Sequence, residues 1–174
     1  MKSNRARKDP IWNEIRSGLK PILGDRMEIV FPDTWSETYL AWYREIEQSS
    51  FRPSLTYSEA EIVDRLAEEG VLLMFITVDD HPEGLFLGYT LGGVTAETFY
   101  IDTIAVKQKG RGIGRVILTV IIKWAKKMGY RVIQLDTEYE NEKGFLLSSF
   151  YEHFGFKIVD TDDEIGNITM QLKI

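Results

Sequence analysis

The sequence contains no cysteine, and only two of its 174 residues are histidine. The lack of cysteine excludes disulfide bonds, thiolate metal sites and a covalent intermediate on a cysteine side chain. His81 precedes Pro82 in an expected turn and His153 lies in an expected helix, which disfavours a multi-histidine metal site and a Ser-His-Asp triad. We therefore predict that the protein holds no metal ion.

Long hydrophobic runs are also missing. No apolar stretch is long enough to span a membrane or to form the core of a signal peptide. The net charge of -6 argues against general binding to nucleic acids and is compatible with a cationic substrate. The default expectation is a soluble cytoplasmic protein without a nucleic-acid or membrane partner.

The apolar pattern predicts α/β (α+β) architecture in a single globular unit. Helices are expected at residues 10–21, 34–48, 58–70, 113–129 and 143–154. Strands are expected at residues 27–31, 71–78, 85–91, 99–106, 131–137, 156–159 and 167–174. This order predicts one mixed, mostly antiparallel sheet of about seven strands, with helices on both faces and an extra N-terminal helix.

Particular residues mark the element boundaries. Thr34 and Ser58, each followed three residues later by glutamate, form capping boxes that begin two of the helices. Asp9 before a proline begins the N-terminal helix, which is expected to stop near Pro21. Residues 79–84 are expected to form the long tip of a hairpin.

Three alternating glycines join the strand at 99–106 to the following helix: Gly110, Gly112 and Gly114. Glycine accepts positive φ angles, and the first turn of a helix leaves N–H groups free, so this junction can bind phosphate. Glycine spacing alone does not separate a phosphate site from a tight structural turn. The flanking cations Lys109, Arg111 and Arg115 favour a polyanionic ligand.

Neither of two better-known phosphate-binding sequences is present. No Lys-Ser or Lys-Thr follows the glycines, as a P-loop requires. Arg115 stands where the dinucleotide-binding fingerprint needs its last glycine. What remains is a G-x-G-x-G sequence flanked by cations, which matches neither of these two phosphate sites.

Two motifs together resemble those of the GNAT superfamily of acyl-CoA-dependent N-acetyltransferases. Residues 109–114 are similar to its pyrophosphate loop, [RQ]-x-x-G-x-[GA], and residues 150–156 to its late L-Y-E-x-x-G-F sequence. The resemblance begins at about Met27. It implies a GNAT domain over residues 27–174, with residues 1–26 forming a tail and a helix that pack on it.

The resemblance also assigns roles to residues. Pyrophosphate of coenzyme A would be held by the backbone of Lys109, Gly110, Arg111, Gly112, Ile113, Gly114 and Arg115. The pantetheine arm would bond to the backbone of Ile104, Ala105 and Val106. Tyr151 would protonate the departing thiolate. Gly144 replaces an asparagine that is frequent in the family, and Asn141 is the candidate to substitute for it.

A carboxylate is the expected general base, because no histidine is suitably placed. A lysine-like amine has a pKa near 10.4, so its neutral form costs about 4.6 kcal/mol at pH 7. We rank Asp136 first, since its position resembles the catalytic glutamate of ribosomal-protein N-terminal acetyltransferases. Glu138 follows, sharing its strand face if the strand continues, and then Asp102, for which a structural hydrogen-bonding role is the alternative.

The resemblance thus implies direct transfer of an acetyl group from acetyl-CoA, as cosubstrate, to a primary amine in a ternary complex. The acceptor would be a small-molecule amine, a polyamine, or a protein or peptide amine, and a cationic one fits the acidic chain. A catalytically silent acyl-CoA-binding or regulatory module is the alternative, and a different phosphate-ligand protein is a third. The acyl preference and the choice between monomer and homodimer stay open.

Overall fold

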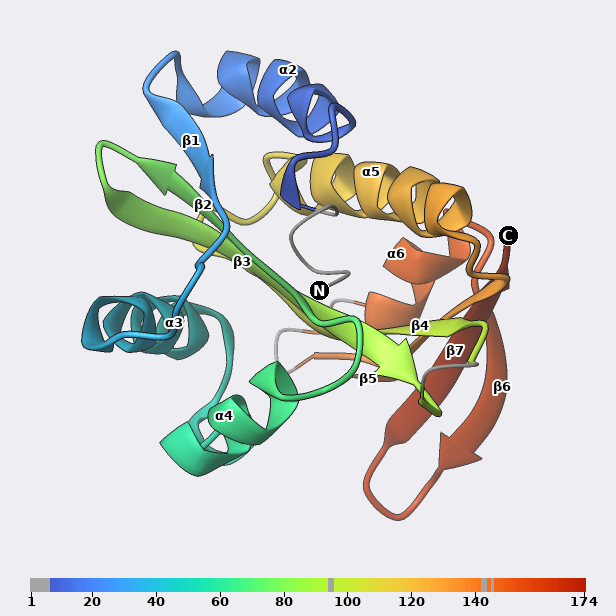
Figure 1. The fold of residues 1–174 in the computed structure, drawn as a ribbon. Coiled ribbons are helices and arrows are strands. Elements are labelled where there is room, and N and C mark those ends of the chain that lie inside the picture. Colours follow the sequence, from blue (N-terminus) through green and yellow to red (C-terminus); the bar gives the residue numbers. More distant parts are fainter. Residues whose placement is uncertain (1–6, 94–95, 142–143, 145) are drawn as a thin grey trace.

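The structure, a computed structural model, describes residues 7–93, 96–141, 144 and 146–174. Seven strands form one sheet in the order β1-β2-β3-β4-β5-β7-β6 (Figure 1). Their bounds are β1 Met27–Val30, β2 Leu72–Val78, β3 His81–Leu91, β4 Thr98–Val106, β5 Val132–Glu138, β6 Lys157–Asp162 and β7 Asn167–Lys173. Neighbouring strands are antiparallel, apart from β4 and β5, which run parallel.

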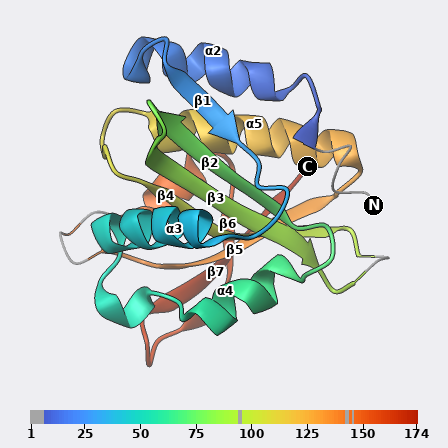
Figure 2. The ribbon, with the colours of Figure 1, turned by 60° about the vertical axis from the view of Figure 1, so that its left-hand side comes forward.

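Helices cover both faces of this sheet, so the predicted architecture is confirmed. The helices are α2 Trp12–Leu23, α3 Glu37–Ser50, α4 Glu59–Leu66, α5 Ile113–Met128 and α6 Leu147–Glu152, with a 3-10 turn η1 Pro53–Leu55. Helices α2 and α5 pack on one face, and α3 and α4 on the other (Figure 2). Each face has its own buried cluster, the larger around Trp124 of α5 and the smaller around Tyr43 of α3.

The two predicted capping boxes have different outcomes. The prediction at Ser58 is confirmed, since its hydroxyl accepts from Glu61 N at 3.2 Å while the Glu61 carboxylate accepts from Ser58 N at 2.7 Å. The prediction at Thr34 is wrong, because α3 begins two residues later than that box implies. Ser36 is the cap, and its hydroxyl accepts from Tyr39 N at 3.4 Å. Both hydroxyl residues precede a helix-forming run, and only the backbone geometry chooses between them.

The hairpin between β2 and β3 is tighter than the predicted tip at residues 79–84. Its turn consists of Asp79 and Asp80, whose φ angles of 50° and 62° are both positive, as a two-residue hairpin turn requires. β3 accordingly begins at His81. Pro82 fits inside the strand because the pairing shifts beside it, next to Glu83.

Three other helices differ from their predicted bounds. α4 stops at Leu66 and does not reach residue 70. α2 continues to Leu23, since a proline at position 21 removes one N–H of the last turn without breaking the helix. α6 is shorter than the expected 143–154, spanning Leu147–Glu152. Residues 142, 143 and 145, where the predicted helix would begin, lie outside the described residues.

The N-terminal helix approaches α5 closely at Gly18. A Cβ atom added there would lie 2.7 Å from Val116 Cγ1, far inside van der Waals contact. Trp12, Ile15 and Leu19 of α2 are buried in the same core cluster as α5. The extra helix is therefore part of the main core.

Replacing Gly18 with alanine should lower the free energy of unfolding by about 1 kcal/mol, measured by urea denaturation. Overpacking costs about 1–3 kcal/mol, and the better helix propensity of alanine returns only about 1 kcal/mol. Ser17→Ala is the matched control, because Ser17 is exposed on the same helix and should change stability by less than about 0.5 kcal/mol. Equal stability of the two variants would contradict the close packing of α2 on α5.

Candidate active site

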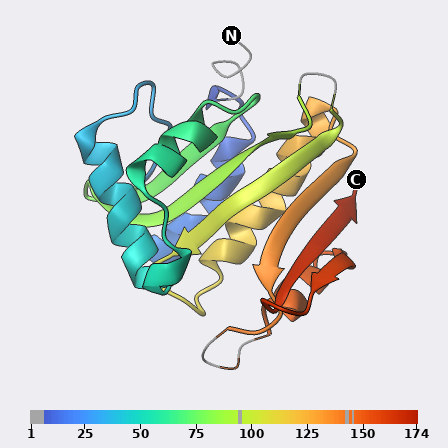
Figure 3. The ribbon, with the colours of Figure 1, turned by 90° about the horizontal axis from the view of Figure 1, so that it is seen from below.

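The sheet opens between its two parallel strands. Pairing of β4 with β5 joins Thr98–Ile101 to Val132–Leu135 and stops there, although both strands continue. Figure 3 shows the strands separating toward their carboxyl ends. The backbone of each strand beyond this point is consequently released from sheet pairing with the other.

A β-bulge at Asp102 marks the start of the opening. On β3, the consecutive residues Leu87 and Gly88 pair with Thr103 and Ile101 of β4, so Asp102 is the extra residue. A bulge reverses the alternation of side chains between the two faces of a strand. Asp102 and Thr103 therefore point to the same face, where the Thr103 hydroxyl donates to Asp102 Oδ1 at 3.0 Å.

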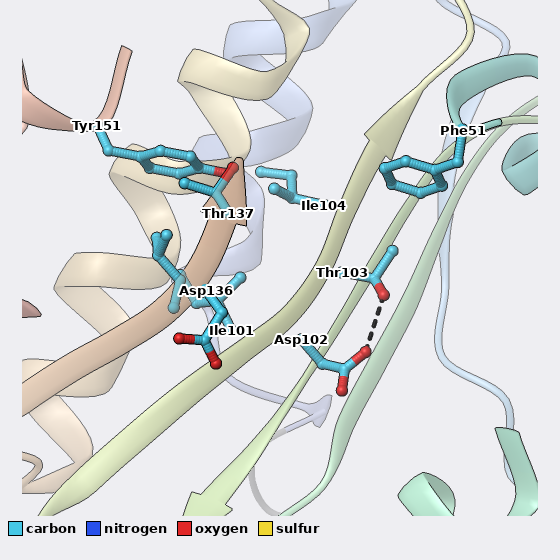
Figure 4. A pocket seen from close by; sticks show the side chains of 9 residues that line it. Phe51, Ile101, Asp102, Thr103, Ile104, Asp136, Thr137 and Tyr151 are labelled. Carbon is cyan, nitrogen blue, oxygen red and sulfur yellow. Dashed lines mark hydrogen bonds between the residues drawn. The ribbon is translucent and has the colours of Figure 1, made fainter. Parts of the chain in front are cut away.

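A cavity of about 90 Å³ lies at the opening (Figure 4). It has room for a group of a few non-hydrogen atoms. Its walls combine an apolar base with polar side chains from both strands, and α6 and the segment after α3 close it. The lining residues are Phe51, Ile101, Asp102, Thr103, Ile104, Leu135, Asp136, Thr137 and Tyr151.

Tyr151 reaches the cavity from α6. Its side chain is 9% exposed, and its ring packs edge-on against Phe150 and Phe156. Burial raises the pKa of the Tyr151 hydroxyl to about 12. Within the described part of the chain this hydroxyl makes no hydrogen bond, so a buried donor is available to a ligand.

Asp136 faces the cavity from β5. Its carboxylate accepts hydrogen bonds from Tyr100 Oη at 2.9 Å and from the Thr169 hydroxyl. Burial, together with the hydrogen bond to this carboxylate, raises the pKa of Tyr100 above its ordinary value. No lysine or arginine among the described residues lies within 4.0 Å of Asp136, so its charge is not neutralised by an ion pair there.

Asp102 differs from Asp136 in having a cation beside it. Its side chain is 3% exposed, and Oδ2 accepts from Arg65 Nε at 2.9 Å and from Tyr89 Oη at 3.0 Å. Burial and the nearby carboxylate raise the pKa of Tyr89. With the Thr103 hydroxyl on its other oxygen, Asp102 is held by three donors.

Glu138 lies at the rim of the cavity. β5 does continue to this residue, so it shares a strand face with Asp136, as predicted. Its carboxylate pairs with Arg52, which follows the cavity-lining Phe51. The ion pair links the segment after α3 to the end of β5 across the mouth of the cavity.

The glycine loop has the conformation that a phosphate ligand needs. Gly110 and Gly112 have φ angles of 76° and 84°, in the left-handed region. No side chain caps α5 at Gly112, which leaves the first-turn N–H groups of Ile113, Gly114 and Arg115 without a side-chain acceptor. A Cβ on Gly110 or Gly112 would meet no atom within 4 Å, so the space above the loop is open.

The three cationic side chains of the loop point in different directions. Lys109 Nζ donates to the Ser50 carbonyl at 3.3 Å. Arg111 donates to the Ile22 carbonyl at 2.8 Å, at the end of α2, and also binds Gln108. The Arg115 guanidinium lies 5.6 Å from the ring centre of Phe154. The backbone amides are thus the loop's best-placed phosphate donors.

The remaining predicted cofactor contacts are spread along β4 and beyond β5. Ile104 lines the cavity, whereas Ala105 faces the α3 side of the sheet. The Val106 carbonyl accepts from Ser50 Oγ at 3.4 Å. Asn141 lies between β5 and α6, where its carbonyl accepts from Gly144 N at 3.0 Å.

Sequence reasoning missed the lining residues Phe51, Ile101, Thr103, Leu135 and Thr137, and also Arg65, which contacts Asp102 from outside the cavity. Phe51 forms a wall of the cavity, but it follows a helix in which three other aromatic side chains gave no reason to single it out. Arg65 reaches Asp102 from α4, across 37 positions of sequence. A single arginine on a charged helix carries no signal of such a contact.

Two searches of the described residues gave negative findings. No group of three or more histidine, aspartate or glutamate side chains in that part of the chain is arranged to hold a metal ion. No helix there is long and apolar enough to cross a membrane.

The open pair of parallel strands, beside an uncapped glycine-rich helix start, is the arrangement expected from the resemblance to acyl-CoA-dependent acyltransferases. Residues 30–156 match the family described as the Acetyltransferase (GNAT) family. The match covers well over half of the chain, which therefore belongs to the GNAT acetyltransferases. The predicted resemblance is confirmed, and the protein is an acyltransferase.

Solved structures agree on the fold. The ribosomal-protein-S18-alanine N-acetyltransferase of Escherichia coli is 21% identical with a TM-score of 0.65, covering 85% of this chain and 94% of its own. A GNAT family acetyltransferase of Elizabethkingia anophelis, solved with acetyl-CoA bound, is 19% identical with a TM-score of 0.62, covering 86% and 99%. The PaiA N-acetyltransferase of Thermoplasma acidophilum, solved with coenzyme A, is 23% identical with a TM-score of 0.58, covering 85% and 99%. No curated protein sequence matches the chain significantly.

Proposed function

We propose that the protein transfers an acetyl group from acetyl-CoA directly to a primary amine, in a ternary complex. The observation that carries this proposal is the buried Tyr151 hydroxyl, which has no partner among the described residues and faces the opening between β4 and β5. Relatives of the same fold that were solved with acetyl-CoA or coenzyme A support the choice of donor.

Acetyl-CoA would lie across the carboxyl ends of the open strands. The amides of residues 109–115 bind its pyrophosphate, favoured by the positive end of the α5 dipole. Beyond Ile101, the unpaired side of β4 offers backbone groups to the pantetheine arm. The thioester then reaches the cavity between Ile104 and Tyr151.

Two residues of the cavity would carry the proton transfers that accompany bond formation and cleavage. The acceptor nitrogen attacks the thioester carbonyl carbon, a C–N bond forms, and the C–S bond breaks. Asp136 takes the proton that the amine loses, directly or through water. Tyr151 donates its hydroxyl proton toward the departing sulfur, whose own proton affinity rises in a cavity shielded from water. With no cysteine in the chain, no cysteinyl acetyl intermediate forms.

Asp136 is the best of the three carboxylates for the role of base. Asp102 is bound by three donors and paired with Arg65, so taking a proton would disrupt that network. Glu138 is paired with Arg52 at the rim. Asp136 has no such cation among the described residues, lines the cavity, and keeps lone pairs free to accept a proton.

We further propose that the acceptor carries positive charge. Asp136 lines the cavity with no lysine or arginine within 4.0 Å among the described residues, so a protonated amine meets an unpaired carboxylate there, whereas the charge of Glu138 is matched by Arg52. The excess of acidic residues over the whole chain acts in the same direction. The rival function is a silent module that binds acyl-CoA without turnover.

Two measurements test the proposal. Saturating coenzyme A should raise the melting temperature, because a ligand that binds only the native state stabilises it. Thiol release from acetyl-CoA should depend on an added amine, across a panel of monoamines, polyamines, amino acids and peptides. A melting shift without thiol release for any amine would favour the silent module, and no shift would contradict coenzyme A binding altogether.

A further inference from the structure

The bulged residue of β4 is held by a side chain from a different layer of the fold. Arg65 crosses from α4 to Asp102 with its Nε 2.9 Å from Oδ2, and is itself only 26% exposed. Its other contacts are with the Glu61 carbonyl, at 3.0 Å, and with the face of the Tyr57 ring, whose centre lies 3.7 Å from the guanidinium carbon. A planar guanidinium fixed between a ring and a carboxylate has little freedom to move.

The ring that supports Arg65 is fixed in turn. Tyr57 N donates to Glu47 Oε1 at 2.8 Å, and the Tyr57 carbonyl accepts from Arg44. Glu47 is 1% exposed on α3, and burial raises its pKa. A continuous set of contacts therefore runs from the core of α3, through the α3–α4 connection and Arg65, to the bulge.

The bulge determines on which face of the sheet each later side chain of β4 lies. Before the bulge Ile101 lies on the α5 face, and after it Ile104 returns to that face while Ala105 turns to the α3 face. The backbone that would lie against the thioester starts at this reversal. Fixing Asp102 therefore fixes the direction of the donor-binding edge of β4.

We propose that Arg65 is a positioning residue for acyl transfer: by clamping Asp102, it holds the β4 bulge and the donor-binding backbone after it in their reactive geometry. This rests on the acetyl-CoA-dependent function proposed above. Arg65 does not line the cavity, so it acts through Asp102 and not on the substrate.

The surroundings of Asp102 explain why Arg65 is needed. Charged or titratable groups face this carboxylate from α3, the α3–α4 connection, α4, β3, β4 itself and, across the cavity, β5. They are Tyr43, Tyr57, Arg65, Tyr89, Tyr100 and Asp136. Arg65 supplies the only positive charge in this set. Without it, a nearly fully buried carboxylate has no counter-charge within this set, which is costly in a site shielded from water.

The test compares Arg65→Gln, Arg65→Lys and the double variant Arg65→Gln with Asp102→Asn. Amide hydrogen exchange, measured by mass spectrometry on ligand-free protein, reports local opening of β4. Exchange over residues 98–106 should be fastest in Arg65→Gln. In Arg65→Lys it should lie between that rate and the rate of the parent, because lysine keeps the positive charge but lacks the planar guanidinium. Arg131→Gln is the matched control, because its exposed pair with Glu97 precedes the start of β4.

Kinetics supply the second readout. With the best amine of the panel, Arg65→Gln should lower kcat about 10- to 100-fold and leave the KM for acetyl-CoA nearly unchanged, since misplaced reacting groups cost rate more than binding. The double variant should lose less kcat than Arg65→Gln alone, because it leaves no unpaired carboxylate buried at position 102.

The outcomes separate the two claims. If the parent protein releases no thiol with any amine while β4 exchange still accelerates in Arg65→Gln, the proposed function fails and the clamp stands. Unchanged exchange over residues 98–106 in Arg65→Gln would overturn the clamp. So would a loss of kcat in the double variant as large as that in Arg65→Gln.

Discussion

Replacing Tyr151 with phenylalanine should lower kcat by about 10²- to 10³-fold, as expected when a general acid is removed. The ring keeps its contacts with Phe150 and Phe156, and the lost hydroxyl has no hydrogen bond within the described residues. Folding stability should therefore be unchanged or slightly higher. The coenzyme A-induced rise in melting temperature should persist, because the pyrophosphate loop is untouched.

Tyr139→Phe is the matched control. Tyr139 is 51% exposed between β5 and α6, so losing its hydroxyl should leave kcat within about twofold of the parent. The parent should also show a pH signature. Since the pKa of Tyr151 is raised to about 12, the acid stays protonated throughout the working range, and kcat should not fall between about pH 8 and about pH 10. Full activity of Tyr151→Phe would remove the acid role.

Replacing Asp136 with asparagine should cost about 10²- to 10⁴-fold in kcat/KM for a lysine-like amine at neutral pH. Asparagine has the shape of aspartate and its amide oxygen still accepts from Tyr100, so the side chain should stay in place. What it loses is the capacity to take a proton. For an amine of pKa near 8 the loss should be smaller, because its neutral form costs only about 1 kcal/mol at pH 7.

Two comparisons complete this experiment. Asp25→Asn is the control, because the Asp25 carboxylate is 94% exposed between α2 and β1. The loss in Asp136→Asn should shrink as the pH rises, since more of the amine is then already neutral. If Glu138→Gln or Asp102→Asn lost this pH-dependent activity instead, with Asp136→Asn intact, the base would be that other carboxylate.

The sequence predicted the parts of this protein whose causes are local. Capping at Ser58, the apolar stripe of α5 and the alternation of β7 each depend on residues close in sequence, and each is present. The glycine loop could be found for the same reason, because positive φ angles at Gly110 and Gly112 restrict the residue type directly. Element order and the fold class followed from these signals.

The unpredicted parts depend on contacts between distant elements. The β4 bulge leaves no mark in the sequence, since the alternation of side chains around Asp102 is ordinary until the pairing with Leu87 and Gly88 is known. The difference between Asp102 and Asp136 depends on a guanidinium brought from α4. Three carboxylates that sequence reasoning could rank only by analogy thus have distinct surroundings in the structure.

The most direct test of the account is the stoichiometry of the reaction with acetyl-CoA and the best amine of the panel, comparing thiol released with N-acetylated amine identified by mass spectrometry. We predict one acetylated amine for each thiol released, and thiol release that depends on the amine. Thiol release without acetylated amine would mean hydrolysis of the thioester. Coenzyme A binding without thiol release for any amine would contradict the proposed transferase and leave a binding module.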